Sequence, residues 1–292
     1  MLDFVFVGPM KTGTSWIHEF LASRKEVNVP ATVKETYFFS DNYHKGEQWF
    51  DKQFGSSDEL AIRGEVGPTY FPNTRAVELV KKHSPDAKII ITLREPYSRF
   101  LSHYFHNVNT GFIEKGTRLD ATYEHKKGVR THSEYFNNVM MWKEIFGDQV
   151  SILLYEDLKF RPDCFARNIC ESLSINHYSI PDNLDQRVGE RRNPMNTSVL
   201  RSALSLAKYL RKHDMHVVVN LSKKLGLIDF LYSKSNPIQE KIDGGEEVFS
   251  IVQQDSIRLK RELDLDISHW ESIWSSSEFQ QESLIDINNL KV

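Results

Sequence analysis

The chain contains three short apolar runs rich in β-forming residues: 2–7 (LDFVFV), 88–93 (KIIITL) and 150–155 (VSILLY). Continuous apolar runs of this length are typical of strands that are buried on both faces of a sheet. Apolar residues recur at helical spacing in five further segments: 14–23, 73–83, 98–107, 133–146 and 164–173. Because strands alternate with helices, the pattern predicts an α/β fold with a central parallel sheet flanked by helices.

Other segments depart from this alternation. Residues 65–71 (EVGPTYF) carry a Gly-Pro pair, so we do not expect a regular central strand there. Residues 109–132 are polar, with three glycines, and indicate a loop or lid. Helical spacing returns in the basic segment 199–224 and again in 240–260. We therefore expect a single domain over residues 1–292, with a core of about 1–200 and a mainly helical C-terminal extension.

Composition narrows the class of protein. The chain has 292 residues, of which 40% are hydrophobic and 26% charged, as in an ordinary globular protein. Its net charge of −3 creates no general attraction to nucleic acid or to an anionic membrane. Any site for an anion must therefore be built locally, and we expect no nucleic-acid partner.

The two cysteines, Cys164 and Cys170, lie six residues apart on a predicted helix and so point to different faces. We interpret them as small apolar residues, which suits a reducing compartment. No apolar run is long enough to span a bilayer. The first strand is predicted from residue 2, which leaves no room for a signal peptide. These features predict a cytoplasmic protein with no membrane span.

The segment after the first strand, residues 8–16 (GPMKTGTSW), has the features of an anion site. A turn between a strand and a helix offers free backbone N–H groups and the positive end of the helix dipole. Gly13 permits close approach of the backbone, Lys11 adds a positive charge, and Thr12, Thr14 and Ser15 add hydroxyl donors. A plain glycine turn with an exposed lysine is the alternative.

The nucleotide-triphosphatase pattern G-x-x-x-x-G-K-[ST] does not fit this loop. Lys11 precedes Gly13 instead of following it, and Thr14 occupies the place of the lysine. The strand at 88–93 ends in Arg94, where an acidic residue would be needed to help hold Mg²⁺. A P-loop phosphotransferase is therefore disfavoured, and we expect an anion site without a metal.

A second anion anchor is predicted where the strand at 88–93 ends. Arg94 follows this strand, at the edge of the sheet where open α/β folds bind ligands. Ser102 follows about two helical turns later. A guanidinium grips a phosphate with two hydrogen bonds, and a hydroxyl adds a neutral donor. Pairing of Arg94 with a neighbouring acid is the structural alternative.

These segments form an ordered set of motifs that resembles the sulfotransferase superfamily. The motifs are G-P-x-K-x-G-T-S-W at 8–16, K-E-x-x-F-F at 34–39, G-E-x-x-P-x-Y-F at 64–71, L-R-E-P-x-x-R-x-x-S-x-Y at 93–104 and L-Y-E-D-L at 154–158. Their order and spacing are most similar to the carbohydrate branch, notably heparan sulfate sulfotransferases, over roughly residues 3–200. The resemblance implies a P-loop-like sulfotransferase fold.

The resemblance implies the donor 3′-phosphoadenosine 5′-phosphosulfate (PAPS), the product adenosine 3′,5′-bisphosphate (PAP), and no metal. The phosphosulfate end would be surrounded by Lys11, Thr12, Gly13, Thr14, Ser15 and Trp16. Lys11 would also be catalytic, by neutralising charge on the bridging oxygen as the sulfuryl group leaves. Arg94 and Ser102 would hold the 3′-phosphate. Arg191 or Arg192 would add a donor contact from a late loop, unless that loop is a solvated basic turn.

The resemblance also implies that Glu35 is the general base of an in-line displacement at sulfur. The acceptor must lose a proton as it attacks, and a carboxylate opposite the leaving phosphate can take it. A surface pair of Lys34 with Glu35 is the alternative reading. His44, His103 and His106 are rival bases, although a lone histidine is more often structural.

Acceptor identity is the least constrained property. Four residues near Glu35 are expected to bind the acceptor, the aromatic ones having the core as their alternative: Lys34, Tyr37, Phe38 and Tyr70. Relatives that act on heparan sulfate usually carry a lysine where this chain has Val66 and an aspartate where it has Ser40. A small metabolite or a carbohydrate with a hydroxyl or amine is therefore expected, and the oligomeric state is open. A non-catalytic nucleotide-binding protein with the same fold is a further alternative.

Overall fold

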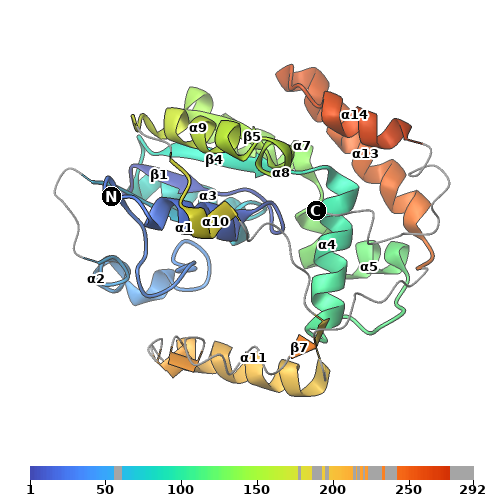
Figure 1. Cartoon of the computed structure of the whole chain (residues 1–292), viewed down its shortest axis with the longest axis horizontal. Coiled ribbons are helices and arrows are strands. Elements are labelled where there is room, and N and C mark those ends of the chain that lie inside the picture. The colour runs from blue at the N-terminus through green and yellow to red at the C-terminus, as the bar shows by residue number, and fades with distance from the viewer. Residues whose placement is uncertain are drawn as a thin grey trace.

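The structure is a computed structural model of the chain. It describes residues 1–55, 61–176, 179–185, 193–194, 197–212, 215, 218–219, 221–222, 232–233 and 242–276. Figure 1 shows the arrangement of the helices and strands within this part.

A five-stranded parallel sheet organises the fold. In spatial order its strands are β2 (Val27–Asn28), β3 (Ile62–Val66), β1 (Phe4–Phe6), β4 (Lys88–Leu93) and β5 (Val150–Leu154). Every neighbouring pair is parallel. The carboxyl ends of β1, β3, β4 and β5 therefore lie along one edge, where open α/β sheets bind ligands. The predicted α/β class with a central parallel sheet is confirmed.

Strand β3 is the element that the sequence pattern missed. It lies between β2 and β1 and ends at Val66, immediately before Gly67. The expectation that 65–71 could not hold a central strand was wrong for its first two residues, because the Gly-Pro pair terminates the strand instead of interrupting it. A short 3₁₀ helix, η2 (Pro68–Tyr70), follows at once.

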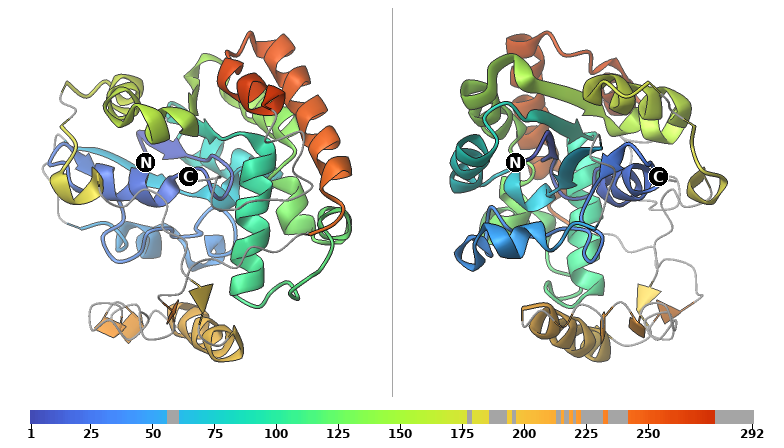
Figure 2. Two further views of the ribbon diagram at one scale, coloured as in Figure 1. Left: turned by 45° about the vertical axis from the view of Figure 1, so that its right-hand side comes forward. Right: turned by 90° about the vertical axis from the view of Figure 1, so that its left-hand side faces the viewer.

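Side chains of the central strands alternate between two apolar layers. Val5 and Val7 face one core, whereas Phe4 and Phe6 face the other. Helices α3 (Thr74–His83) and α7 (Tyr135–Phe146) cover the first face. Helices α1 (Thr14–Ala22) and α9 (Pro162–Leu173) cover the second. Figure 2 shows the sheet between these helical layers, as a parallel sheet buried on both faces requires.

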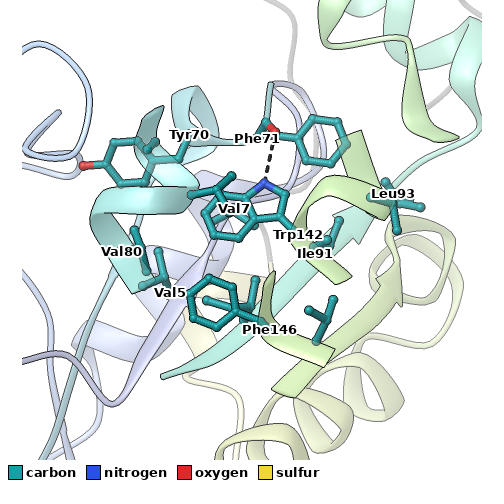
Figure 3. Close-up of a cluster of buried hydrophobic side chains, with 14 of the residues drawn as sticks. Val5, Val7, Tyr70, Phe71, Val80, Ile91, Leu93, Trp142 and Phe146 are labelled. Atoms are coloured by element: carbon teal, nitrogen blue, oxygen red, sulfur yellow. Dashed lines mark hydrogen bonds between the residues drawn. The ribbon is translucent and has the colours of Figure 1, made fainter. Parts of the chain in front are cut away.

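The first core is built around Trp142 of α7. This side chain is fully buried, and its indole Nε1 donates a hydrogen bond of 3.0 Å to the carbonyl of Phe71. Figure 3 shows the indole among Val7, Ile91 and Phe146. The bond removes the cost of burying an unpaired polar N–H in an apolar layer.

A third apolar cluster lies beyond the carboxyl edge of β4. It joins α4 (Pro96–Asn109), α5 (Leu119–His125), α6 (Lys127–Thr131) and α13 (Gly245–Leu263). The expectation of an irregular loop over 109–132 was therefore wrong for much of that segment. Leu119, Tyr123 and Val129 are buried there, and such packing turns a polar-looking segment into two short helices.

The last described helix, α14 (Ser268–Ser275), returns to the end of β4. The indole of Trp274 donates to the carboxylate of Glu95, and that of Trp270 to Glu156, each at 2.9 Å. Glu156 is the second residue of α8 (Tyr155–Phe160), and its carboxylate also accepts a hydrogen bond of 2.8 Å from the backbone N–H of Glu95. Residues far apart in the chain thus meet beside Arg94.

The remaining elements are short or lie away from the sheet. They are η1 (Tyr43–Lys45), α2 (Glu47–Asp51), η3 (Gly147–Gln149), α10 (Asp182–Asp185), α11 (Thr197–Lys212) and a two-stranded sheet of β6 (Asn193–Pro194) and β7 (Tyr232–Ser233). Among the described helices, none combines the length and apolar character needed to cross a bilayer. The single-domain organisation over 1–292 stays a prediction.

Candidate active site

The 8–13 loop joins β1 to α1, and two of its residues have a backbone conformation that favours glycine. Gly13 has φ of 81° and Lys11 has φ of 75°, both in the left-handed region. A Cβ on Gly13 would lie 2.8 Å from Leu158 and 3.1 Å from Tyr155, so both sterics and φ require glycine. Helix α1 begins at the next residue, Thr14, and carries no acidic residue in its first turn. The free N–H groups there face no built-in anion.

The loop is held from behind by side chains of three other segments. Arg94 and Arg99 each donate from Nη1, at 3.3 Å, to the carbonyls of Lys11 and Met10 respectively. The backbone N–H of Met10 donates to Nδ1 of His132, also at 3.3 Å. Burial lowers the pKa of His132 to about 3, so its ring is neutral and can accept. These bonds hold Lys11 in a conformation that a non-glycine residue adopts at a cost.

Two predicted donor-binding residues of this loop serve the interior. The hydroxyl of Thr12 is buried and hydrogen-bonds the carbonyl of Pro9 and the hydroxyl of Thr92, at 2.8 and 2.9 Å. Trp16 is buried as well and stacks on Phe20 with ring centroids 5.0 Å apart. Both therefore shape the loop through the core.

Arg94 is a buried cation beside this loop. It is 5% exposed, and its guanidinium lies over the Tyr155 ring, 4.8 Å from the centroid. In the described part of the chain it makes no ion pair with a carboxylate, so the alternative of a neighbouring acid is not what the structure gives. The charge of Arg94 acts on the carboxylate of nearby Glu156, with which it forms no direct ion pair in this part of the chain. A buried guanidinium without a direct salt bridge can still offer charge-assisted hydrogen bonds to an anionic ligand. Ser102 lies partly exposed on α4.

Lys34 and Glu35 form the third part of the site, and they have different partners. Lys34 Nζ lies 3.1 Å from the hydroxyls of both Thr14 and Ser15, so it faces the start of α1. Glu35 Oε1 instead accepts from Thr69, at 3.1 Å from the backbone N–H and 2.5 Å from the hydroxyl. The side chain of Lys34, predicted to contact an acceptor, thus lies beside the 8–13 loop.

Glu35 is half-buried as a residue, and its carboxylate has a perturbed affinity for protons. Burial raises its pKa above the usual range, and the Thr69 hydrogen bonds and the charge of Lys34 oppose that rise. A carboxylate of raised pKa takes up a proton more readily than an ordinary surface acid. This is the property that a general base near neutral pH needs.

A model of the family described as "Sulfotransferase domain" matches residues 2–201 of the chain. The chain belongs to the sulfotransferase domain family. It is 29% identical to a Caenorhabditis elegans protein named bifunctional heparan sulfate N-deacetylase/N-sulfotransferase 1, over 59% of this chain and 22% of that protein. It is 34% identical to mouse heparan sulfate glucosamine 3-O-sulfotransferase 3A1, over 34% of this chain and 25% of that one. It thus spans about a quarter or less of either relative.

A solved sulfotransferase structure has the same fold. The crystal structure of a sulfotransferase from Alicyclobacillus acidocaldarius superposes with a TM-score of 0.65, at 21% sequence identity. The match covers 93% of this chain and 99% of the other. The predicted sulfotransferase resemblance and the P-loop-like sulfotransferase fold are confirmed.

The aromatic residues predicted to bind an acceptor divide into two groups by their exposure. Tyr37 is 37% exposed beside Glu35. Phe38 and Tyr70 have no exposed surface: Phe38 stacks on Phe50 at 4.3 Å, and Tyr70 donates to Glu65. Phe38 and Tyr70 therefore belong to the core, which was the alternative to acceptor binding in the sequence analysis.

The rival histidine bases differ in their surroundings. Burial, with the nearby Arg99 charge, lowers the pKa of His103 to about 2, and its Nδ1 lies 3.3 Å from Arg99. Burial and the charge of Lys11 lower the pKa of His106 to about 4. His44 is exposed and contacts the carbonyl of Asp41. Arg191 and Arg192 lie outside the described residues.

Sequence reasoning missed Thr69 as the partner of Glu35. Thr69 follows Pro68 in η2, directly after the end of β3. Recognising β3 as a strand beside β1 would have placed Thr69 at the carboxyl edge of the sheet, close to the 8–13 loop. The sequence pattern did not reveal β3, so Thr69 was not placed there. Within the described residues, no cluster of His, Cys, Asp or Glu has the arrangement of a metal site.

Proposed function

We propose that this chain transfers a sulfuryl group from PAPS to a hydroxyl or amine of an acceptor, with Glu35 as the general base. One observation carries the proposal: three cations gather where β1 turns into α1. Lys11 belongs to the loop, the buried Arg94 donates to its backbone carbonyl, and Lys34 contacts the start of α1. A donor with two separated anionic groups fits this arrangement, because each group would meet its own cation.

Lys11, Lys34 and the start of α1 would hold the phosphosulfate end, and Arg94 with Ser102 the 3′-phosphate. PAPS, when bound, supplies an activated sulfuryl group. Positive charge from Lys11 would stabilise the negative charge that develops on the leaving oxygen. Glu35, held by Thr69, would take the proton of the attacking acceptor atom. The chain's own groups thus cover donor binding, charge stabilisation and proton transfer.

The relatives' names refer to heparan sulfate, which makes a carbohydrate acceptor plausible for this chain. The net charge of −3 and the apolar Val66 favour a less anionic acceptor, either a carbohydrate or a small metabolite. A cytoplasmic location is part of the same proposal, and it is supported by two cysteines that are both free thiols.

Isothermal titration with PAP tests donor binding. We expect binding that persists in EDTA, and we expect Arg94→Ala to raise the Kd about 10- to 100-fold, as removal of a charged hydrogen-bond donor does. Arg258→Ala is a control for the loss of an arginine elsewhere, because Arg258 is an exposed residue of α13 whose guanidinium lies over the ring of Phe136. Binding of ATP–Mg²⁺ in place of PAP would instead favour a phosphotransferase.

A screen for sulfated products by mass spectrometry tests the reaction itself. PAPS is combined with panels of sugars, phenols and amines, and a mass gain of one SO₃ identifies the acceptor. A protein that binds PAP but transfers to no acceptor would be a non-catalytic nucleotide-binding member of the family.

A further inference from the structure

A second carboxylate, Glu65, lies behind the proposed base. It is the fourth residue of β3, and its side chain has no exposed surface. Its Oε2 accepts a hydrogen bond of 2.6 Å from the hydroxyl of Thr36, and its Oε1 accepts one of the same length from the hydroxyl of Tyr70. Thr36 is adjacent in sequence to the proposed general base, Glu35. Tyr70 is adjacent to Thr69, the residue that donates to Glu35.

The result is a reciprocal exchange between two chain segments. In the first segment Glu35 accepts from Thr69, while its neighbour Thr36 donates to Glu65. In the second segment Tyr70, next to Thr69, also donates to Glu65. Each segment therefore contributes one hydroxyl to the carboxylate of the other, and these two bonds fix the relative position of the segments. The bond from Tyr70 to Glu65 lies within the second segment.

The segment after Glu35 is held further through the same two hydroxyl groups. The Thr36 hydroxyl accepts from the backbone N–H of Phe38 at 3.1 Å, and the Tyr70 hydroxyl accepts from that of Phe39 at 3.3 Å. Asn42 donates to the carbonyl of Thr36 at 2.7 Å. The backbone after Glu35 is thus tied at several points, and the two hydroxyl groups that accept from it also donate to Glu65.

This arrangement is expensive, which argues that it does more than fill space. Burial, together with the charge of Glu35, raises the pKa of Glu65 to about 7. No lysine, arginine or histidine forms an ion pair with Glu65 within the described residues. A carboxylate buried without a cation is destabilising, and an apolar residue would pack the site at less cost.

We propose that Glu65 is a positioning residue for sulfuryl transfer: it fixes Thr36 and Tyr70, and through them it aims the carboxylate of Glu35 at the acceptor. The inference rests on the proposed role of Glu35 as the base. It assigns a mechanistic reason to a buried acid that makes no contact with the 8–13 loop.

The test compares Glu65→Gln and Thr36→Val with the wild type in steady-state sulfuryl transfer and in PAP titration. Glutamine keeps the shape of the side chain but carries an NH₂ donor in place of one carboxylate oxygen, so one of the two hydroxyls loses its acceptor there. We expect kcat to fall about 10- to 100-fold in both variants, because small displacements of a reacting group have effects of this size. The KM for PAPS and the Kd for PAP should stay within about twofold.

Asp255→Asn is the matched control. Asp255 on α13 is less buried than Glu65, but it is likewise an acid that accepts two hydrogen bonds, from the backbone N–H groups of Tyr135 and Phe136. Its substitution imposes a similar loss of hydrogen bonding without touching the segment of Glu35. We expect its kcat to stay near the wild-type value, and an equal fall in kcat would mean that general destabilisation explains the effect.

A pH profile separates positioning from a structural role. The groups that face Glu65 are the hydroxyls of Thr36 and Tyr70 and the carboxylate of Glu35, which itself faces Lys34. Once protonated, Glu65 accepts these hydrogen bonds less strongly. The wild-type kcat should therefore step down as pH falls through about 7, and Glu65→Gln should lose that step and keep only the fall that protonation of Glu35 causes.

Failure of the inference and failure of the proposed function give different results. If the wild type binds PAP but transfers no sulfuryl group, the proposed function fails. If the wild type turns over and Glu65→Gln shows the same kcat and the same pH step as the wild type, the positioning role is refuted. Should Glu65→Gln not fold, Thr36→Val alone decides, and an unchanged kcat in that variant equally refutes the role.

Discussion

Two glutamates in adjacent segments have raised pKa values for the same main reason, burial, but they differ in exposure. Glu35 keeps contact with solvent, whereas Glu65 has none. A titratable group needs access to its substrate in order to act on it, so the exposed member of the pair is the one suited to proton transfer. The buried member is suited to holding the other in place.

Replacement of Glu35 tests this division of roles. Glu35→Gln removes the proton acceptor but keeps the size of the side chain and its ability to accept from Thr69. We expect kcat to fall about 100- to 10,000-fold, the usual contribution of general acid–base catalysis. The Kd for PAP, measured by titration calorimetry, should be unchanged, since Glu35 faces Thr69 and not the 8–13 loop. A kcat within a few-fold of wild type would assign the base elsewhere.

Glu65 should also leave a signature in stability. Its pKa in the folded state is about 7 against 4.5 ordinarily, so the folded state binds this proton more tightly. The contribution is fully present below about pH 4.5 and is lost as pH rises through 7, by on the order of 3 kcal/mol. Urea unfolding at about pH 5 and about pH 9 should show a steeper loss for the wild type than for Glu65→Gln. Parallel losses would contradict the raised pKa.

At the scale of elements, most of the fold could be predicted because its strands are continuous apolar runs. The five helices predicted within residues 14–173 are all present, with ends within two residues of those expected. Helices α11 and α13 overlap the two later segments of helical spacing, and α13 begins five residues after the predicted start at 240. Strand β3 was missed because its run is short and mixed, with Arg63, Gly64 and Glu65 in it. Burial of Glu65 comes from pairing with β1 and from two hydroxyls, neither of which an apolar pattern records.

The same scale explains what could be predicted of the site. Motifs located the 8–13 loop and Arg94, because each follows a strand, whereas Glu35 was located only through the family resemblance. The contacts of Lys34 and the burial of Phe38 and Tyr70 depend on tertiary packing, so residue type alone left them open. The helices α5 and α6 are a further case, because their apolar residues are buried against α4 and against α13, which lies far along the chain.

Gly13 tests the geometry of the loop. Gly13→Ala places a Cβ 2.8 Å from Leu158 and forces a side chain into a left-handed φ of 81°. We expect a loss of stability of about 1–3 kcal/mol and weaker PAP binding, measured by thermal unfolding and calorimetry. Gly128→Ala is the control, since Gly128 is helical and its added Cβ meets open space. That variant should be neutral or stabilised by up to about 1 kcal/mol.

At the scale of the whole molecule, the carboxyl edge of the sheet is completed by the C-terminal helix. Trp274 donates to Glu95, whose carboxylate also caps α4 through the N–H groups of Tyr97 and Ser98 at 3.1 and 2.6 Å. Burial raises the pKa of Glu156, and the hydrogen bond from Trp270 opposes this rise. Two acids beside Arg94 thus depend on indoles from the far end of the chain.

Trp274→Phe tests that dependence. The change removes one hydrogen bond to a buried carboxylate, and we expect a loss of about 1–3 kcal/mol in unfolding free energy. Trp16→Phe is a matched control, because within the described residues the indole Nε1 of Trp16 is buried without a hydrogen-bond partner. Both changes shrink a buried ring, so the difference between them in urea unfolding isolates the hydrogen bond. Equal losses would show that α14 contributes packing alone.

The link from α14 to the end of β4 also has a consequence for synthesis on the ribosome. The segment that the family model matches, residues 2–201, emerges first and contains every strand of the main sheet. Until the last helix follows, the carboxylates of Glu95 and Glu156 lack their indole donors. A nascent chain halted after residue 201 should therefore be sensitive to proteolysis around Arg94, and protection should appear only when Trp270 and Trp274 have left the exit tunnel.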